Sequence, residues 1–182
     1  MSQRWSKYER KERDLYETPE WVTQALLPHL PKGGVFWEPA CASGKMVRVL
    51  RTHTLRVLAS DVEPLCERST KEDFLKTQRD VDCIVTNPPF DQSSEFIIHA
   101  MTCTKKNKGC FAMLLRTDFD HAKTRRWLFG DNPIFSKKLV LLRRITWFEP
   151  EPGAKGKSPS FNHAWFMWDW KHDGPPTIVY GG

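Results

Sequence analysis

The sequence has few cysteines and no long hydrophobic run. Its five cysteines, at positions 41, 66, 83, 103 and 110, are widely spaced and form no C-x-x-C pair. Because they are odd in number and lack a partnering histidine cluster, a disulfide framework or a metal site is not expected. No apolar run approaches the about 20 residues of a membrane helix, and the N-terminus lacks the apolar segment of a secretory signal. We therefore expect a cytoplasmic protein with reduced thiols and no membrane partner.

Glycine and proline are not enriched either. The chain of 182 residues contains 10 Gly and 13 Pro, with 27% charged and 40% hydrophobic residues. This composition is typical of a globular protein and excludes low-complexity and collagen-like chains. The length suits one hydrophobic core. We expect a polar N-terminal arm over residues 1–14 and a single domain over residues 15–182.

Positive charge is concentrated in one part of the chain. Lys and Arg number 28 against 22 Asp and Glu, and residues 104–145 contain eleven basic and three acidic side chains. A clustered positive surface attracts polyanions, so nucleic acid is an expected partner, with an ordinary solvated face as the alternative. The candidate nucleic-acid contacts are Arg116, Lys123, Arg125, Arg126, Lys137 and Lys138. For target recognition, the basic stretch 116–138 and the Gly/Pro-rich loop 149–160 are candidates.

Strand-like and helix-like patterns alternate along the chain. Strands are predicted at residues 35–37, 55–60, 81–85, 110–115, 139–145 and 161–170. Helices are predicted to begin near residues 18, 44 and 64 and to cover 93–105 and 119–129. This order predicts an α/β fold with a doubly wound, mainly parallel sheet and helices on both faces. Such sheets bind ligands beyond the carboxyl ends of their strands.

Two of the candidate binding elements follow the first two strands. The segment from Glu38 to Lys45 is rich in small residues, which let the backbone approach a ligand and direct N–H groups at an anionic part of it. Asp61 ends the next strand, where a carboxylate accepts hydrogen bonds from ribose hydroxyls. A helix cap is the alternative role for Asp61. The lack of a G-x-G-x-x-G spacing argues against a standard dinucleotide site.

The sharpest motif is Asn87-Pro88-Pro89-Phe90, directly after a predicted strand. Two prolines fix the backbone and remove two donors, which leaves carbonyl oxygens available. Asn87 adds a side-chain acceptor and Phe90 a flat apolar ring. This combination suits a planar group that carries an amine, and a purely structural turn is the alternative.

These elements resemble a known family in order and spacing. The segment Glu38-Pro39-Ala40-Cys41-Ala42-Ser43-Gly44, then Asp61, Asp73-Phe74-Leu75 and Asn87-Pro88-Pro89-Phe90, is similar to S-adenosylmethionine-dependent adenine-N6 DNA methyltransferases. The small enzymes of phages and prophages are the most similar, and the resemblance spans nearly the whole chain. The N-P-P-F element also occurs, with Phe or Tyr last, in methyltransferases that act on ribosomal RNA and on protein glutamine.

The resemblance implies a role for each matching position. The residues implied to hold the methionine end of S-adenosylmethionine are Thr18, Pro19, Glu38, Pro39, Ala40, Cys41 and Gly44. Asp61 would hold the ribose, and Asp73 and Phe74 the cofactor's adenine. Asn87 and the Pro88 carbonyl would grip the amine of the target adenine, with Pro89 fixing the turn and Phe90 stacking on the base. No metal is implied.

Ala42 departs from the family, which usually has Gly at this position. If the position requires a positive φ, the extra β-carbon costs roughly 1 kcal/mol or more. The sequence therefore leaves three functions open: a DNA adenine methyltransferase, an RNA adenine methyltransferase, and an inactive relative that binds nucleic acid.

Overall fold

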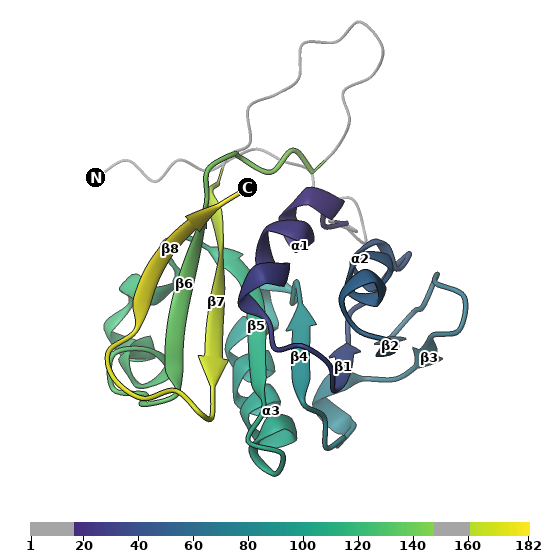
Figure 1. Cartoon of the computed structure of the whole chain (residues 1–182), viewed down its shortest axis with the longest axis horizontal. Helices are drawn as coiled ribbons and strands as arrows, with labels where there is room; N and C mark the ends of the chain where they lie inside the picture. Colours follow the sequence, from purple (N-terminus) through teal and green to yellow (C-terminus); the bar gives the residue numbers. More distant parts are fainter. Residues whose placement is uncertain (1–16, 148–160) are drawn as a thin grey trace, which may run out of the picture.

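The computed structural model describes residues 17–147 and 161–182. The expected arm at 1–14 and the loop at 149–160 lie outside these residues. One sheet of eight strands, in the order β3-β2-β1-β4-β5-β7-β6-β8, forms the centre of the described part (Figure 1). The strands are β1 Val35–Glu38, β2 Arg56–Asp61, β3 Thr70–Lys71, β4 Cys83–Thr86, β5 Cys110–Arg116, β6 Phe135–Leu141, β7 His163–Asp169 and β8 Thr177–Gly181.

The strand pairs are parallel except those of β7, which runs antiparallel to both β5 and β6. The described helices are α1 Glu20–Leu26, α2 Lys45–His53 and α3 Ser93–Lys105, with short 3-10 turns η1 Leu27–His29, η2 Phe74–Lys76, η3 Phe90–Gln92, η4 Phe119–His121 and η5 Lys123–Leu128. The predicted doubly wound, mainly parallel α/β fold is confirmed. No helix in the described part is long and apolar enough to cross a bilayer.

Alternation along the strands divides the core between the two faces of the sheet. Phe36 packs with the apolar faces of α1 and α2, whereas its neighbour Trp37 packs with α3 on the opposite face. The same alternation assigns Trp165 and Trp168 of β7 to opposite faces, and both are fully buried. A strand covered on both sides has buried residues at every position, which explains the dense apolar runs of β4, β5 and β7.

Several predicted elements were placed wrongly. The helix expected from residue 64 is absent, because the chain turns with Arg68 at φ 61° and then forms β3. The helix expected over 119–129 is split into η4 and η5, since Ala122 between them is extended. Strand β6 covers 135–141 instead of 139–145, and the edge strand β8 was not predicted.

Candidate active site

The turn between β1 and α2 has a strained but well-bonded backbone. Ala42 has φ 43° and Gly44, the N-cap of α2, has φ 81°. The Ala42 N–H donates to Oδ2 of Asp61 over 2.9 Å, and the Cys41 N–H donates to the Ser60 carbonyl over 3.0 Å. Two bonds to the end of β2 therefore hold the turn, which keeps Ala42 in a conformation that favours glycine.

Asp61 supports this turn and the segment after β2. Its Oδ1 accepts from the Glu63 N–H over 2.9 Å, and its Oδ2 accepts from Ala42. A carboxylate has about four lone-pair sites, so each oxygen keeps one further acceptor site. The two bonds fix the carboxylate at the carboxyl end of β2, beside the β1–α2 turn.

Glu38, at the end of β1, is only 1% exposed. Its Oε1 accepts from the Thr86 hydroxyl over 2.6 Å and from the Ala40 N–H over 3.1 Å. Its Oε2 is buried and has no hydrogen-bond partner among the described residues. Burial raises the pKa of Glu38 to about 8, despite the lowering effect of the two hydrogen bonds. The carboxyl group is thus protonated at neutral pH until a cation lies beside it.

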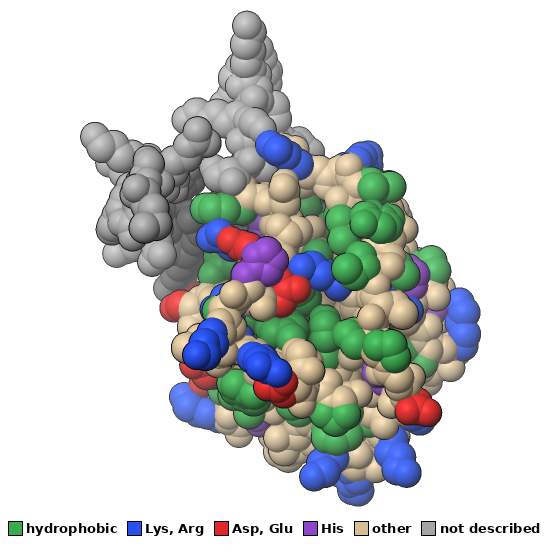
Figure 2. Space-filling view, turned by 90° about the vertical axis from the view of Figure 1, so that its left-hand side faces the viewer, with side chains coloured by type: hydrophobic (Ala, Val, Ile, Leu, Met, Phe, Trp, Pro, Cys, Tyr) green, Lys and Arg blue, Asp and Glu red, His purple; other side chains and the backbone are tan. Residues whose placement is uncertain are grey.

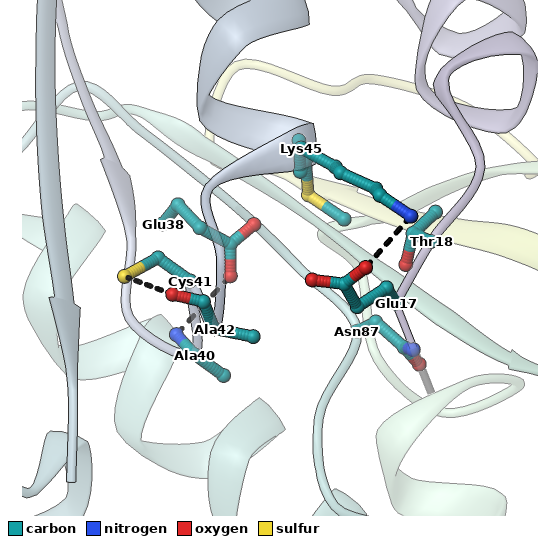
Figure 3. A pocket seen from close by; sticks show the side chains of 9 residues that line it. Glu17, Thr18, Glu38, Ala40, Cys41, Ala42, Lys45 and Asn87 are labelled. Atoms are coloured by element: carbon teal, nitrogen blue, oxygen red, sulfur yellow. Dashed lines mark hydrogen bonds and ion pairs between the residues drawn. The ribbon is translucent and has the colours of Figure 1, made fainter. Parts of the chain in front are cut away.

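An open pocket lies between three parts of the chain (Figure 3). The segment before α1, the β1–α2 turn and the end of β4 contribute its walls. The lining residues are Glu17, Thr18, Glu38, Ala40, Cys41, Ala42, Lys45, Met46 and Asn87. Glu17 and Met46 were not among the predicted site residues, and Lys45 was only the end of the predicted small-residue segment.

Glu17 and Lys45 form an ion pair of 2.7 Å at this pocket, and Figure 3 shows their side chains reaching toward each other from separate segments. The pair joins the chain before α1 to the first turn of α2. Lys45 directly follows Gly44, the N-cap of α2. The sequence therefore showed that Lys45 lies at the end of the motif, but not that it pairs with Glu17. Burial opposes ionisation of Glu17, and hydrogen bonds from Lys45 and Ser43 nevertheless lower its pKa.

Asn87 lines the same pocket as Glu38, although 49 positions separate them in the sequence. After Asn87 the chain buries Pro88, exposes Pro89 and enters the 3-10 turn η3. The Ser93 hydroxyl lies 3.1 Å from the Pro89 carbonyl oxygen and 3.2 Å from that of Phe90, which fixes this corner. Phe90 is 49% exposed and is not among the residues that line the pocket.

Asp73 and Phe74 are not among the residues that line the pocket. Asp73 accepts from the Leu75 N–H over 3.1 Å and pairs with Lys76 over 2.8 Å, and its pKa is lowered mainly by the Lys76 hydrogen bond. Phe74 is only 2% exposed, and its ring contacts those of Trp37, Phe96 and His99. The cofactor-binding roles assigned to Asp73 and Phe74 stay predictions.

The basic segment forms more internal ion pairs than its composition suggested. Its three acidic residues, Asp118, Asp120 and Asp131, pair with Arg116, Lys138 and Arg126 at 2.7, 2.7 and 2.8 Å respectively.

The Arg125 guanidinium donates to the Phe119 carbonyl over 2.7 Å and lies over the ring of Phe119. Of the six predicted contacts, Arg125, Lys123 and Lys137 form no ion pair with another described residue. On the face shown in Figure 2, blue side chains are scattered among red and green ones. Internal ion pairs therefore neutralise part of the positive charge predicted for this surface.

No group of three or more metal-ligating side chains occurs among residues 17–147 and 161–182.

The sequence matches no protein-family model and no curated protein. Its fold is nevertheless found in many solved structures.

One neighbour, the type I restriction enzyme EcoKI M protein, superposes with a TM-score of 0.62 at 12% identity, over 85% of this chain and 44% of that one. The 23S rRNA methyltransferase ErmE gives 0.55 at 15% identity, over 88% and 70%. A putative class I S-adenosylmethionine-dependent methyltransferase from Listeria monocytogenes gives 0.54 at 15% identity, over 82% and 58%. The chain has the class I methyltransferase fold. It spans only about half the length of the EcoKI and Listeria proteins, and at these identities the likeness concerns the fold.

Proposed function

We propose that this protein transfers a methyl group from S-adenosylmethionine to the N6 amine of adenine in DNA. The observation that carries the proposal is that Asn87 of the N-P-P-F corner and Glu38 of the β1–α2 turn line one pocket. Two motifs with complementary chemistry are thereby adjacent. One suits a donor with an amino-acid end, and the other suits an acceptor with a planar amine.

The residues present fit S-adenosylmethionine. The buried Oε2 of Glu38 lacks a partner among the described residues, and an α-ammonium group beside it would supply one. The Lys45 ammonium at the pocket is a suitable partner for a carboxylate, in exchange for Glu17. Thr18 and Ala40 would complete the wall around the methionine end, with Pro19, Pro39, Cys41 and Gly44 fixing the backbone.

Asp61 retains acceptor sites for ribose hydroxyls, and the adenine end of the cofactor would extend toward Asp73 and Phe74. When bound, the cofactor supplies an already activated methyl group on a sulfonium. The chain then has to align the acceptor nitrogen with that methyl, which is a positioning task.

Asn87 and Pro88 would hold the target amine by two acceptors, the Asn87 side-chain oxygen and the Pro88 carbonyl. The amine lone pair of adenine is delocalised into the ring, which makes it a poor nucleophile. Two fixed acceptors favour a tetrahedral nitrogen and stabilise its developing positive charge, as an oxyanion hole does for the opposite sign. A strong general base is not required for this role.

Phe90 would stack on the face of the adenine. Taking a base out of a duplex costs a few kcal/mol, and stacking on an aromatic ring contributes about 1–3 kcal/mol in return. Phe90 is 49% exposed, so part of its side chain is accessible from solvent.

RNA adenine methylation is the second candidate function, favoured by the likeness to ErmE and to a dimethyladenosine transferase from Plasmodium falciparum, which has a TM-score of 0.54. The purified protein should be incubated with tritiated S-adenosylmethionine and separate DNA, RNA and protein substrates. Label in DNA, recovered as N6-methyladenine, is the expected result. Label in RNA alone would replace the DNA proposal, and label in protein alone would reject both.

A further inference from the structure

A row of rings and one guanidinium continues from Phe90 along the carboxyl edge of the sheet. The Phe90 ring centroid lies 6.1 Å from that of His163, at the start of β7. His163 also meets Trp147 edge-on at 5.0 Å. Trp147, in the segment after β6, and Phe161, just before β7, both lie in this region. These residues extend the site away from the pocket that holds Glu38.

Arg116 and His163 are cross-strand partners in the antiparallel β5–β7 pair. Direct partners project from the same face of a sheet, so Arg116 lies on the same side as His163 and Phe90. The Arg116 guanidinium carbon is 3.9 Å from the ring centroid of Phe161. This is a flat cation stacked on a ring that is itself 44% exposed.

Asp118 fixes the plane of this guanidinium. Its two carboxylate oxygens accept from Nε and Nη2 of Arg116 over 3.0 and 2.7 Å. The bidentate pair neutralises the positive charge of Arg116 and holds its orientation. Arg116 is therefore better suited to stack on a flat ligand than to attract a phosphate.

His163 joins the two stacking surfaces without adding charge. Burial lowers its pKa to about 4, with a further lowering by Arg116, so the imidazole is neutral at physiological pH. Both ring nitrogens are buried, and a hydrogen bond with the Phe161 backbone partly offsets the lowering of the pKa. The neutral imidazole, only 5% exposed, thus packs between Phe90 and the Arg116–Phe161 pair.

We propose that the Arg116–Phe161 pair is a second base-binding subsite, which stacks the nucleotide next to the target adenine while Phe90 stacks the adenine itself. This proposal rests on the function proposed above and names its substrate more closely: two consecutive unpaired bases, with His163 between their subsites. Rings and guanidinium planes stack on every base, so the subsite tolerates different neighbouring sequences. A protein group that is planar, partly exposed and charge-neutralised fits a nucleobase better than a phosphate.

The test measures binding of short single-stranded DNA by fluorescence anisotropy, with S-adenosylhomocysteine present and no methyl transfer required. The probes contain one adenine and carry either a normal base or an abasic residue on its 5′ or 3′ side. For the unmodified protein, an abasic residue on one side is expected to weaken binding by about 5- to 150-fold, the range that loss of one base stack implies.

Phe161→Ala is expected to weaken binding of the intact probe by a similar factor and to abolish the discrimination against the abasic probe. Arg116→Lys keeps the charge and removes the plane, so it should act in the same direction. Tyr180→Ala, which removes an exposed ring on the distant strand β8, should change neither value. If Phe161→Ala lowers the unfolding temperature substantially, Phe161→Leu retains apolar bulk and gives the same comparison.

Unchanged binding by Phe161→Ala, or discrimination that persists in it, overturns the second subsite. The proposed function fails separately: a protein that discriminates abasic probes but transfers no methyl group refutes the enzyme and keeps the subsite. A protein that methylates adenine without any discrimination keeps the enzyme and refutes the subsite.

Discussion

Replacing Ala42 with glycine tests the strained turn at the centre of the site. Ala42 adopts φ 43°, which places its β-carbon against its own backbone. The turn is already tied by the bond from the Ala42 N–H to Asp61 and by the bond from the Leu65 N–H to the Ala42 carbonyl. The strain is therefore present in the folded protein before any ligand binds. Relieving it should change the free energy of unfolding and not the affinity for the ligand.

The expected gain is the difference between two opposing terms. A left-handed conformation costs a non-glycine residue about 1–2 kcal/mol, whereas glycine costs about 0.4–1 kcal/mol through the greater freedom of the unfolded chain. With the middle of both ranges, Ala42→Gly should thus raise the free energy of unfolding by about 0.8 kcal/mol. For a chain of this size the midpoint of thermal unfolding would rise by about 1–4 °C. Calorimetry should find the affinity for S-adenosylmethionine changed by less than about twofold.

Ala40→Gly is the matched control in the same turn. Ala40 is not among the residues with positive φ, so glycine there relieves no strain, adds unfolded-state freedom and removes a methyl that packs against the core; it should lower the stability by at least about 0.4–1 kcal/mol. A loss of stability in both variants would refute the strain at Ala42. A large gain in cofactor affinity in Ala42→Gly would show that the turn forms only on binding, contrary to the argument.

Three further predictions concern pH, backbone conformation and charge. The pKa of Glu38 is raised to about 8, so between about pH 4.5 and 8 only the unfolded chain loses this proton and stability falls as pH rises. Measured by denaturant unfolding, Glu38→Gln should lack this decrease of stability with pH. Parallel plots of stability against pH for the variant and the unmodified protein would contradict the raised pKa. Gly44→Ala should lower the free energy of unfolding by at least about 1 kcal/mol, because φ is 81° and the new β-carbon would contact the Cys66 sulfur; unchanged stability would refute this. Lys123→Gln should reduce the salt dependence of DNA binding by about 0.7–0.9 in log–log slope. Lys138→Gln should change it less, since that ammonium bonds Asp120 and is only 14% exposed, and equal slopes would contradict the distinction.

The turn motifs were predictable from the sequence because their chemistry is local. Small residues after a strand, an acid at the end of the next strand and a diproline corner each reflect their own backbone requirements. The parallel sheet then brings the ends of adjacent strands β1 and β4 together. Asn87 and Glu38 could therefore be predicted to share a cleft from the order of strands alone.

The pairings between distant side chains were not predictable in this way. Asp120 of η4 cancels the charge of Lys138 in β6, 18 positions away, which composition counts as free, and only the packing of these two elements makes that contact. The burial of Phe74 between three rings likewise depends on α3 packing against η2. Strand β8 has a β-branched signal at Thr177–Gly181, but its pairing with β6 joins segments about 40 residues apart.

The most direct test of the account is Asn87→Ala, examined by two measurements on the same preparation. Calorimetry reports the affinity for S-adenosylmethionine, and recovery of labelled N6-methyladenine reports transfer to DNA. We predict that transfer is abolished while the cofactor affinity stays within about twofold of that of the unmodified protein. Equal loss of both, or transfer that persists, would contradict the placement of Asn87 at the acceptor side of the pocket.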